Sequence, residues 1–245
     1  MSKELNWQLE LQEYIKQGEP ERAEKSAAWQ TAIGLQAVDG LKTSDYLLET
    51  AKEHIEGNID MSAAKQRINS YYEVRQDRKS VEDETMEADM VSVRIAEILG
   101  EKTFQFSPVE LQNIHRRLFA DVFDHAGKIR TYNISKKEWV LNGDTVIYAS
   151  YGSIRDTLDY DFAQEKQFFY ENLSISEAVR HIAQFTSGIW QIHPFIKFCL
   201  EKGTFPNCGR CPIYVNTCIQ VFFWGETEKR SCSKQLRKGK IKLTI

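Results

Sequence analysis

The sequence lacks several features that would point directly to a class of protein. It contains no run of 18 apolar residues, the usual length of a helix that crosses a bilayer, and the polar stretch 1–10 does not resemble a signal peptide. The formal net charge of −3 gives no general attraction to nucleic acid or to an anionic membrane. We therefore expect a cytoplasmic protein with no nucleic-acid partner and no membrane partner.

Cysteine is missing from the first 198 residues, so any cysteine-based site is confined to the end of the chain. Residues 196–245 also carry a local charge of +7, whereas the preceding 195 residues sum to −10. This shift predicts a boundary and a divergent, basic, cysteine-rich tail over 196–245. The pair Cys208 and Cys211 lacks the second closely spaced pair of a zinc ribbon, so we predict no metal site there. The five cysteines are Cys199, Cys208, Cys211, Cys218 and Cys232.

Residues 1–76 show apolar positions at helical spacing, interrupted by short glycine-containing stretches. Gly57 is expected to end one helix, and Asp60 to be the N-cap of the next, over 61–74. These patterns predict a small N-terminal helical bundle. The charged stretch 75–90 has no strong core pattern, and we interpret it as a linker or the solvated start of a helix.

The main domain is predicted to span 77–195 and to be mostly α-helical. One amphipathic helix ends at Gly100, and another begins after Ser107 with Pro108 in its first turn. His115 lies on that second helix beside two arginines, and we interpret it as a surface or helix-packing histidine rather than a ligand.

One β-hairpin is predicted within this helical domain. The β-rich runs 137–141 and 145–148 are separated by Asn142-Gly143-Asp144, and Asn-Gly between such runs is a strong hairpin signal. An isolated hairpin must pack on helices or offer its edge to another chain.

A long helix then leads to the motif Ile192-His193-Pro194-Phe195. Ser174 and Glu177 form the pattern of a capping box at its start, and its apolar stripe predicts the most buried helix of the protein. His181 falls off that stripe and is predicted to be a half-exposed packing residue. Proline removes a backbone donor and disfavours helical geometry at the preceding residue, so His193 is expected at the helix exit, facing a cleft.

The motif and two further segments resemble the Fic (Fido-domain) family. The run from His125 to Ile134 contains Ala126-Gly127-Lys128-Ile129-Arg130, which is similar to the Ala-Gly-x-x-Arg segment before the family's hairpin. The end of the hairpin resembles the family's flap, which docks the target by main-chain pairing; its residues here are Thr145, Val146, Ile147 and Tyr148. The resemblance covers roughly residues 90–195 and implies a Fic-type helical domain with one hairpin.

The resemblance implies a protein adenylyltransferase (AMPylase), a nucleotidyltransferase that moves AMP from ATP to a Ser, Thr or Tyr hydroxyl of a target protein. His193 is then the general base, a role that suits an imidazole at neutral pH. Pro194, Phe195, Gly127 and Arg130 are implied to be structural parts of the motif, with Phe195 packed in the core. ATP and Mg²⁺ are the cofactors expected from the family.

The sequence departs from the family after Phe195. The family continues with an acid that holds Mg²⁺, then Gly-Asn and an arginine that meets phosphate, but here Lys197 replaces the acid and Phe198 the glycine. A lysine cannot hold Mg²⁺, and a phenylalanine blocks close approach of the backbone to phosphate. We therefore predict no metal ligand and an impaired or inactive transferase.

A change of reading frame would explain the tail. The segment 206–212 can be encoded so that reading one nucleotide later gives Arg-Thr-Val-Ala-Val-Val-Arg, which is similar to the segment after the motif in the family. The coding DNA tests this hypothesis, because a tail without a shifted family segment is genuine divergence.

The N-terminal region resembles the antitoxin-like helices that accompany some Fic proteins, in 32–41 and in 54–59. In that class a glutamate blocks productive ATP binding, which makes Glu56 and Asp39 inhibitory candidates, although Lys52 stands where the pattern has Ser or Thr. A structural or substrate-positioning role for this region is the alternative. The alternative for the whole protein is a non-catalytic binding module that uses the hairpin to pair with a partner strand.

Overall fold

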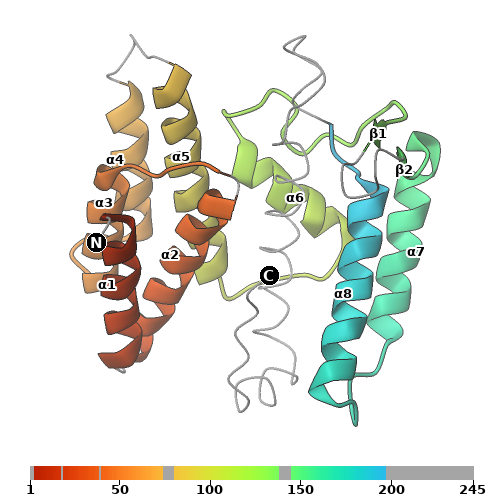
Figure 1. Cartoon of the computed structure of the whole chain (residues 1–245), viewed down its shortest axis with the longest axis horizontal. Coiled ribbons are helices and arrows are strands. Elements are labelled where there is room, and N and C mark those ends of the chain that lie inside the picture. The colour runs from red at the N-terminus through yellow and green to blue at the C-terminus, as the bar shows by residue number, and fades with distance from the viewer. Residues whose placement is uncertain (1–2, 18, 39, 74–79, 138–144, 197–245) are drawn as a thin grey trace. The chain divides into compact units, whose positions relative to one another are not determined.

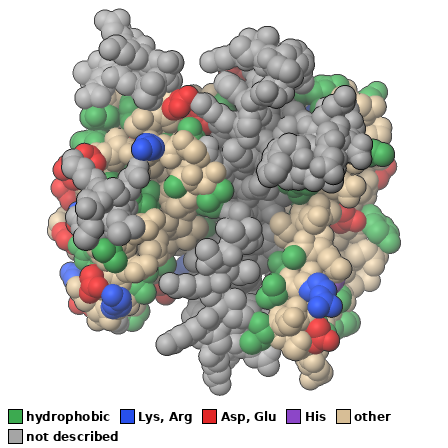
Figure 2. Space-filling model, viewed as in Figure 1, with side chains coloured by type: hydrophobic (Ala, Val, Ile, Leu, Met, Phe, Trp, Pro, Cys, Tyr) green, Lys and Arg blue, Asp and Glu red, His purple; other side chains and the backbone are tan. Residues whose placement is uncertain are grey.

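The computed structural model describes residues 3–17, 19–38, 40–73, 80–137 and 145–196. These residues form a mostly helical protein, as the sequence predicted, and they divide into two compact units at residues 1–102 and 103–245. No helix among the described residues is long and apolar enough to cross a membrane. Figure 2 shows acidic and basic side chains intermixed over the described part of one face.

The first unit contains α1 (Lys3–Gln17), α2 (Pro20–Val38), α3 (Asp45–Glu56), α4 (Met61–Glu73) and α5 (Ser80–Gly100). Its core includes Trp29 and Ile55, and the indole nitrogen of Trp29 donates to Nδ1 of His54 at 3.0 Å. Local signals set the helix ends as expected: Gly57 takes a left-handed conformation after α3, and Asp60 accepts from the backbone of Ala63 before α4.

Helix α5 confirms a helix start within residues 75–90, but the end of that stretch is buried rather than solvated. It is continuous from Ser80, and Ala88 and Asp89 in its first half are fully buried. α5 packs on α2 and α4 of the first unit (Figure 1), and this compact unit extends to residue 102. The three-dimensional packing of α5 outweighed the charged composition of its start.

The second unit contains α6 (Pro108–Phe119), β1 (Ser135–Lys137), β2 (Thr145–Ile147), a 3-10 turn η2 (Tyr151–Ser153), α7 (Ile154–Gln167) and α8 (Ile175–Ile192). Ser107 caps α6 and Pro108 stands in its first turn, as predicted. α7 and α8 run antiparallel beside each other (Figure 1).

Helix α8 differs from its predicted burial. Only Ala178, Ile189 and Ile192 on it are buried, whereas Val179, Ile182 and Phe185 of the same apolar stripe are half-buried. It is therefore not the most buried helix of the described protein, since six residues of α2 are buried against three of α8.

Candidate active site

His193 lies at the C-terminal end of α8, as the sequence predicted. The helix begins with the predicted capping box, in which Ser174 and Glu177 satisfy each other's backbone amides, and it ends where His193 adopts φ 47° and ψ 66°. This left-handed conformation is uncommon for a residue with a side chain and must be held by its surroundings. The His193 residue is 2% exposed.

Arg130 holds this turn in place from a segment 62 residues away in the sequence. Its Nε donates to the carbonyl of His193 at 2.8 Å, and one terminal nitrogen donates to the carbonyl of Ile192 at 3.0 Å. Its backbone amide also donates to the carbonyl of Pro194 at 2.9 Å. Arg130, expected to be a structural residue, therefore caps the C-terminal end of α8.

The segment around Arg130 runs antiparallel to the motif. Ile129 and Phe195 form an isolated β-bridge, and the amide of Ile196 donates to the carbonyl of Lys128 at 3.4 Å. Phe195 is 2% exposed and stacks on His115, with ring centroids 3.8 Å apart. The motif is thus a packed turn between two chain segments.

Buried His115 is hydrogen-bonded to the backbone of Gly127. The Gly127 amide donates to Nδ1 of His115 at 2.8 Å, and its carbonyl accepts from Gln112 at 2.7 Å. Gly127 has φ +76°, and a Cβ there would lie 2.6 Å from Cβ of Arg116, so only glycine fits. His115 is a packing histidine, which confirms one of the two interpretations offered for it; the surface alternative is wrong.

The two paired strands stand beside this turn. β1 and β2 are antiparallel, with Ser135 opposite Ile147 and Lys137 opposite Thr145, so β1 begins earlier than the run 137–141 predicted. The turn expected at Asn142–Asp144 lies outside the described residues. Ile147 is 82% exposed, while Tyr148 turns inward with its ring centroid 5.2 Å from that of His193.

Three residues that the sequence did not single out join the strands to α8. Ala149 donates its amide to the carbonyl of Gln191 at 3.4 Å, and the side chain of Gln191 reaches the carbonyl of Ile147 at 3.5 Å. Trp190 packs against Tyr148 at 5.9 Å between ring centroids. For Trp190 and Gln191, the only sequence signal is their place within one turn of His193.

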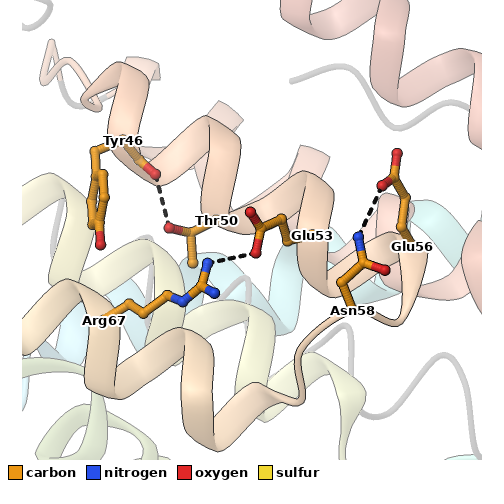
Figure 3. Close-up of polar contacts among 6 residues, drawn as sticks. All are labelled: Tyr46, Thr50, Glu53, Glu56, Asn58 and Arg67. Atoms are coloured by element: carbon orange, nitrogen blue, oxygen red, sulfur yellow. Dashed lines mark hydrogen bonds and ion pairs between the residues drawn. The ribbon is translucent and has the colours of Figure 1, made fainter.

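The two inhibitory candidates differ in what can be said of them. Asp39 lies outside the described residues. Glu56 is the exposed last residue of α3; it accepts a hydrogen bond from the hydroxyl of Tyr14 at 2.6 Å and one from the side-chain nitrogen of Asn58 at 3.3 Å. Figure 3 shows the contact with Asn58 near the pair formed by Glu53 and Arg67. Bonding to Glu56 raises the pKa of Tyr14 to about 12.

Two further polar residues of α3 are also engaged within the first unit. Lys52, at the position where the antitoxin pattern has Ser or Thr, forms an ion pair with Glu10. The hydroxyl of Thr50 donates to the carbonyl of Tyr46 at 2.8 Å (Figure 3). These contacts give α3 a structural role in its own unit, and a role for Glu56 in inhibition stays a prediction.

His181 is a half-buried packing residue, as expected. Its Nε2 lies 2.7 Å from a carboxylate oxygen of Glu165, and Phe168 stacks on its ring at 3.4 Å between centroids. The hydroxyl of Tyr170 binds the other oxygen of Glu165. This cluster fastens the loop between α7 and α8.

Mg²⁺ prefers carboxylate oxygens as ligands. Within the described residues, no three His, Cys, Asp or Glu side chains come together. In the sequence, Lys197 stands where the resemblance requires the metal-binding acid. We therefore derive no step through a metal ion.

The fold and the site together define a helical domain in which a histidine at a helix exit adjoins an antiparallel strand pair. Residues 105–197 match the model of the Fic/DOC family. This match confirms the resemblance to that family drawn from the His193 and Gly127 segments. No curated protein and no solved structure matches the chain.

Proposed function

We propose that this chain is a Fic-type protein that keeps the base of a protein adenylyltransferase but has lost the part of the site that holds the nucleotide. The proposal rests on the contacts that fix the backbone turn at His193. Arg130 donates to the carbonyl of His193, and Phe195 packs on His115. Such a rigid turn positions an imidazole for proton transfer.

In the reaction expected from the family, the base removes the proton of a target Ser, Thr or Tyr hydroxyl. The oxygen then attacks the α-phosphorus of ATP, a P–O bond to the nucleotide forms, and pyrophosphate leaves. Stabilising the charge on the phosphates needs preorganised cations and backbone amides. Lys197 and Phe198 replace the acid and the glycine that the family uses there, so we expect AMP transfer to be impaired or absent.

Incubation of the full chain with labelled ATP, Mg²⁺ and a cell lysate tests the proposal. We expect no protein labelling above that of His193→Ala. A second variant restores the family pattern through Lys197→Asp, Phe198→Gly, Cys199→Asn and Glu201→Arg. We expect this variant to label protein, and the label to disappear when His193→Ala is added.

Two outcomes would contradict the proposal. Labelling by the natural chain that depends on His193 would show that the nucleotide site is intact. Failure of a folded, restored variant to bind ATP or label protein would show that more than these positions has been lost.

A second candidate function is a binding module without catalysis, and the exposure of Ile147 favours it. A two-stranded sheet has open edges that an extended partner segment can extend by main-chain hydrogen bonds. ATP-independent retention of one partner, lost when Ile147→Asp is introduced but kept in His193→Ala, would support this function over the enzyme.

A further inference from the structure

Arg130 joins three parts of the second unit through one side chain. Besides the carbonyls of Ile192 and His193, its guanidinium donates to the carbonyl of Tyr132 at 2.7 Å and to that of Ala149. Tyr132 precedes β1, and Ala149 follows β2. The same planar group therefore holds the end of α8 and both outer ends of the strand pair.

The electrostatics of this contact are unusual for a buried arginine. Arg130 is 1% exposed, and all four of its side-chain acceptors are main-chain carbonyls rather than carboxylates. Its positive charge meets the negative end of the α8 dipole, which favours a cation at the last carbonyls. A buried cation costs free energy unless its N–H donors all have acceptors. If one of the segments that carry these carbonyls moved away, an N–H group of Arg130 would lose its acceptor, which is unfavourable.

Ala149 is the point at which the strands meet the catalytic turn. Its carbonyl accepts from Arg130, and its amide donates to the carbonyl of Gln191 on the last turn of α8. One residue earlier, Tyr148 packs on His193, and the residue before it, Ile147, points outward. The order of inward-facing and outward-facing side chains at the end of β2 is thus fixed relative to His193.

We propose that Arg130 is a positioning residue that fixes the register of β2 relative to His193. A segment that pairs with the strands then places its residues at a fixed offset from the base. In this way Arg130, which need not touch the target, selects which target position lies beside His193. The target part of this inference rests on the proposed function, but the junction itself does not.

Hydrogen exchange of the full chain, resolved to single amides by NMR, tests the junction without any activity. We compare the variants Arg130→Lys and Arg130→Gln with the control variants Arg155→Lys and Arg155→Gln. Arg155 is an exposed residue of α7. Lysine keeps the charge but not the planar fork, so it cannot reach all four carbonyls. We expect exchange of the Ala149 amide to accelerate about 10-fold or more in Arg130→Lys, the scale of a lost charge-assisted hydrogen bond.

The pattern of exchange separates positioning from general support of the fold. In Arg130→Lys, amides in the middle of α7 should exchange as in the natural protein, and the Arg155 variants should change neither region. Equal acceleration of α7 and Ala149 would mean a merely structural role and would overturn the proposal, as would unchanged exchange at Ala149. If Arg130→Gln does not fold, Arg130→Lys decides alone.

Chemical rescue gives a second readout. In Arg130→Ala, added guanidinium ion at a concentration far below that of denaturation should slow exchange at Ala149, whereas ammonium ion should not. Rescue by both ions or by neither, in a folded variant, would contradict a role for the planar donor set. If the folded, restored variant fails to label protein while the exchange pattern is the one expected above, the result counts against the proposed function only.

Discussion

At the scale of single residues, His115 is a neutral histidine that accepts a hydrogen bond from the backbone. Its Nδ1 accepts from the amide of Gly127, a role that a protonated ring cannot fill. Burial, with a contribution from His125, lowers the pKa of His115 to about 3 from its usual 6.5. The folded protein therefore resists protonation at this site.

This shift predicts that the second unit loses stability in acid. Because the pKa is lower in the folded state, the contribution is complete above pH 6.5 and declines as the pH falls from about 6.5 towards 3. The loss amounts to at most about 1.4 kcal/mol per pH unit. Urea unfolding between pH 7 and pH 4 measures it, with His115→Phe as the comparison.

His115→Phe keeps a ring to stack on Phe195 but leaves the Gly127 amide without its acceptor, so it should cost about 1–3 kcal/mol at pH 7. Its stability should also decline less steeply in acid. Burial lowers the pKa of His54 as well, but His54 is present in both proteins and cancels in the comparison. Equal acid slopes in the two proteins would rule out His115 as the source.

At the scale of elements, the helices of the first unit are joined at the start of α3. Ser44 caps that helix by accepting from the amide of Leu47 at 3.1 Å, and its own amide donates to Asp89 of α5 at 2.9 Å. The hydroxyl of Tyr72 on α4 also donates to Asp89, at 2.7 Å. Asp89 is 0% exposed, and burial raises its pKa against the lowering effect of these hydrogen bonds.

The hydroxyl of Ser44 also donates to Asp89. Ser44→Ala should therefore destabilise the first unit by about 2 kcal/mol, because it removes both a helix cap and this hydroxyl donor to a buried carboxylate. Ser62→Ala, at an exposed position in the first turn of α4, is the matched control and should change stability by less than about 0.5 kcal/mol. Denaturant unfolding followed by circular dichroism measures both. A change as small for Ser44 as for Ser62 would show that the buried carboxylate is satisfied in another way.

At the scale of the whole molecule, the half-buried stripe of α8 is the feature that affects behaviour in solution. Val179, Ile182 and Phe185 keep part of their apolar surface accessible, and Phe169 in the preceding loop is 80% exposed. Apolar side chains that remain accessible along one helix promote association. The resemblance implies the same, because the family closes its core with helices after the motif, and the tail after Phe195 has no matching apolar stripe.

We therefore predict concentration-dependent aggregation of the full chain, measured by light scattering during mild heating. Val179→Gln with Ile182→Gln should reduce it, because both substitutions lower the apolar character of the stripe at positions that are not fully buried. Ser176→Gln on the same helix is the control and should have no effect. A monodisperse chain with cooperative unfolding at a high midpoint would refute the prediction.

The sequence by itself determined the local structure and the chemistry of the motif. Ser107-Pro108, the Ser174 and Glu177 pair and Gly57 each act within a few residues, so their helix ends could be predicted from neighbouring residue types. His193 before a proline fixed the helix exit in the same way, and Lys197 after it revealed the missing acid.

Only the tertiary structure decided which distant segments hold that exit. The acceptors of Arg130 at the end of α8 lie more than 60 residues away in the sequence, and the acceptor for the Gly127 amide is His115 on α6. No local periodicity therefore indicates either contact. The burial of α5 and the incomplete cover of α8 likewise depend on which helices pack against them. Local signals specify where helices begin and end, whereas the partners of each face are set by packing and hydrogen bonds between segments that are far apart in the chain.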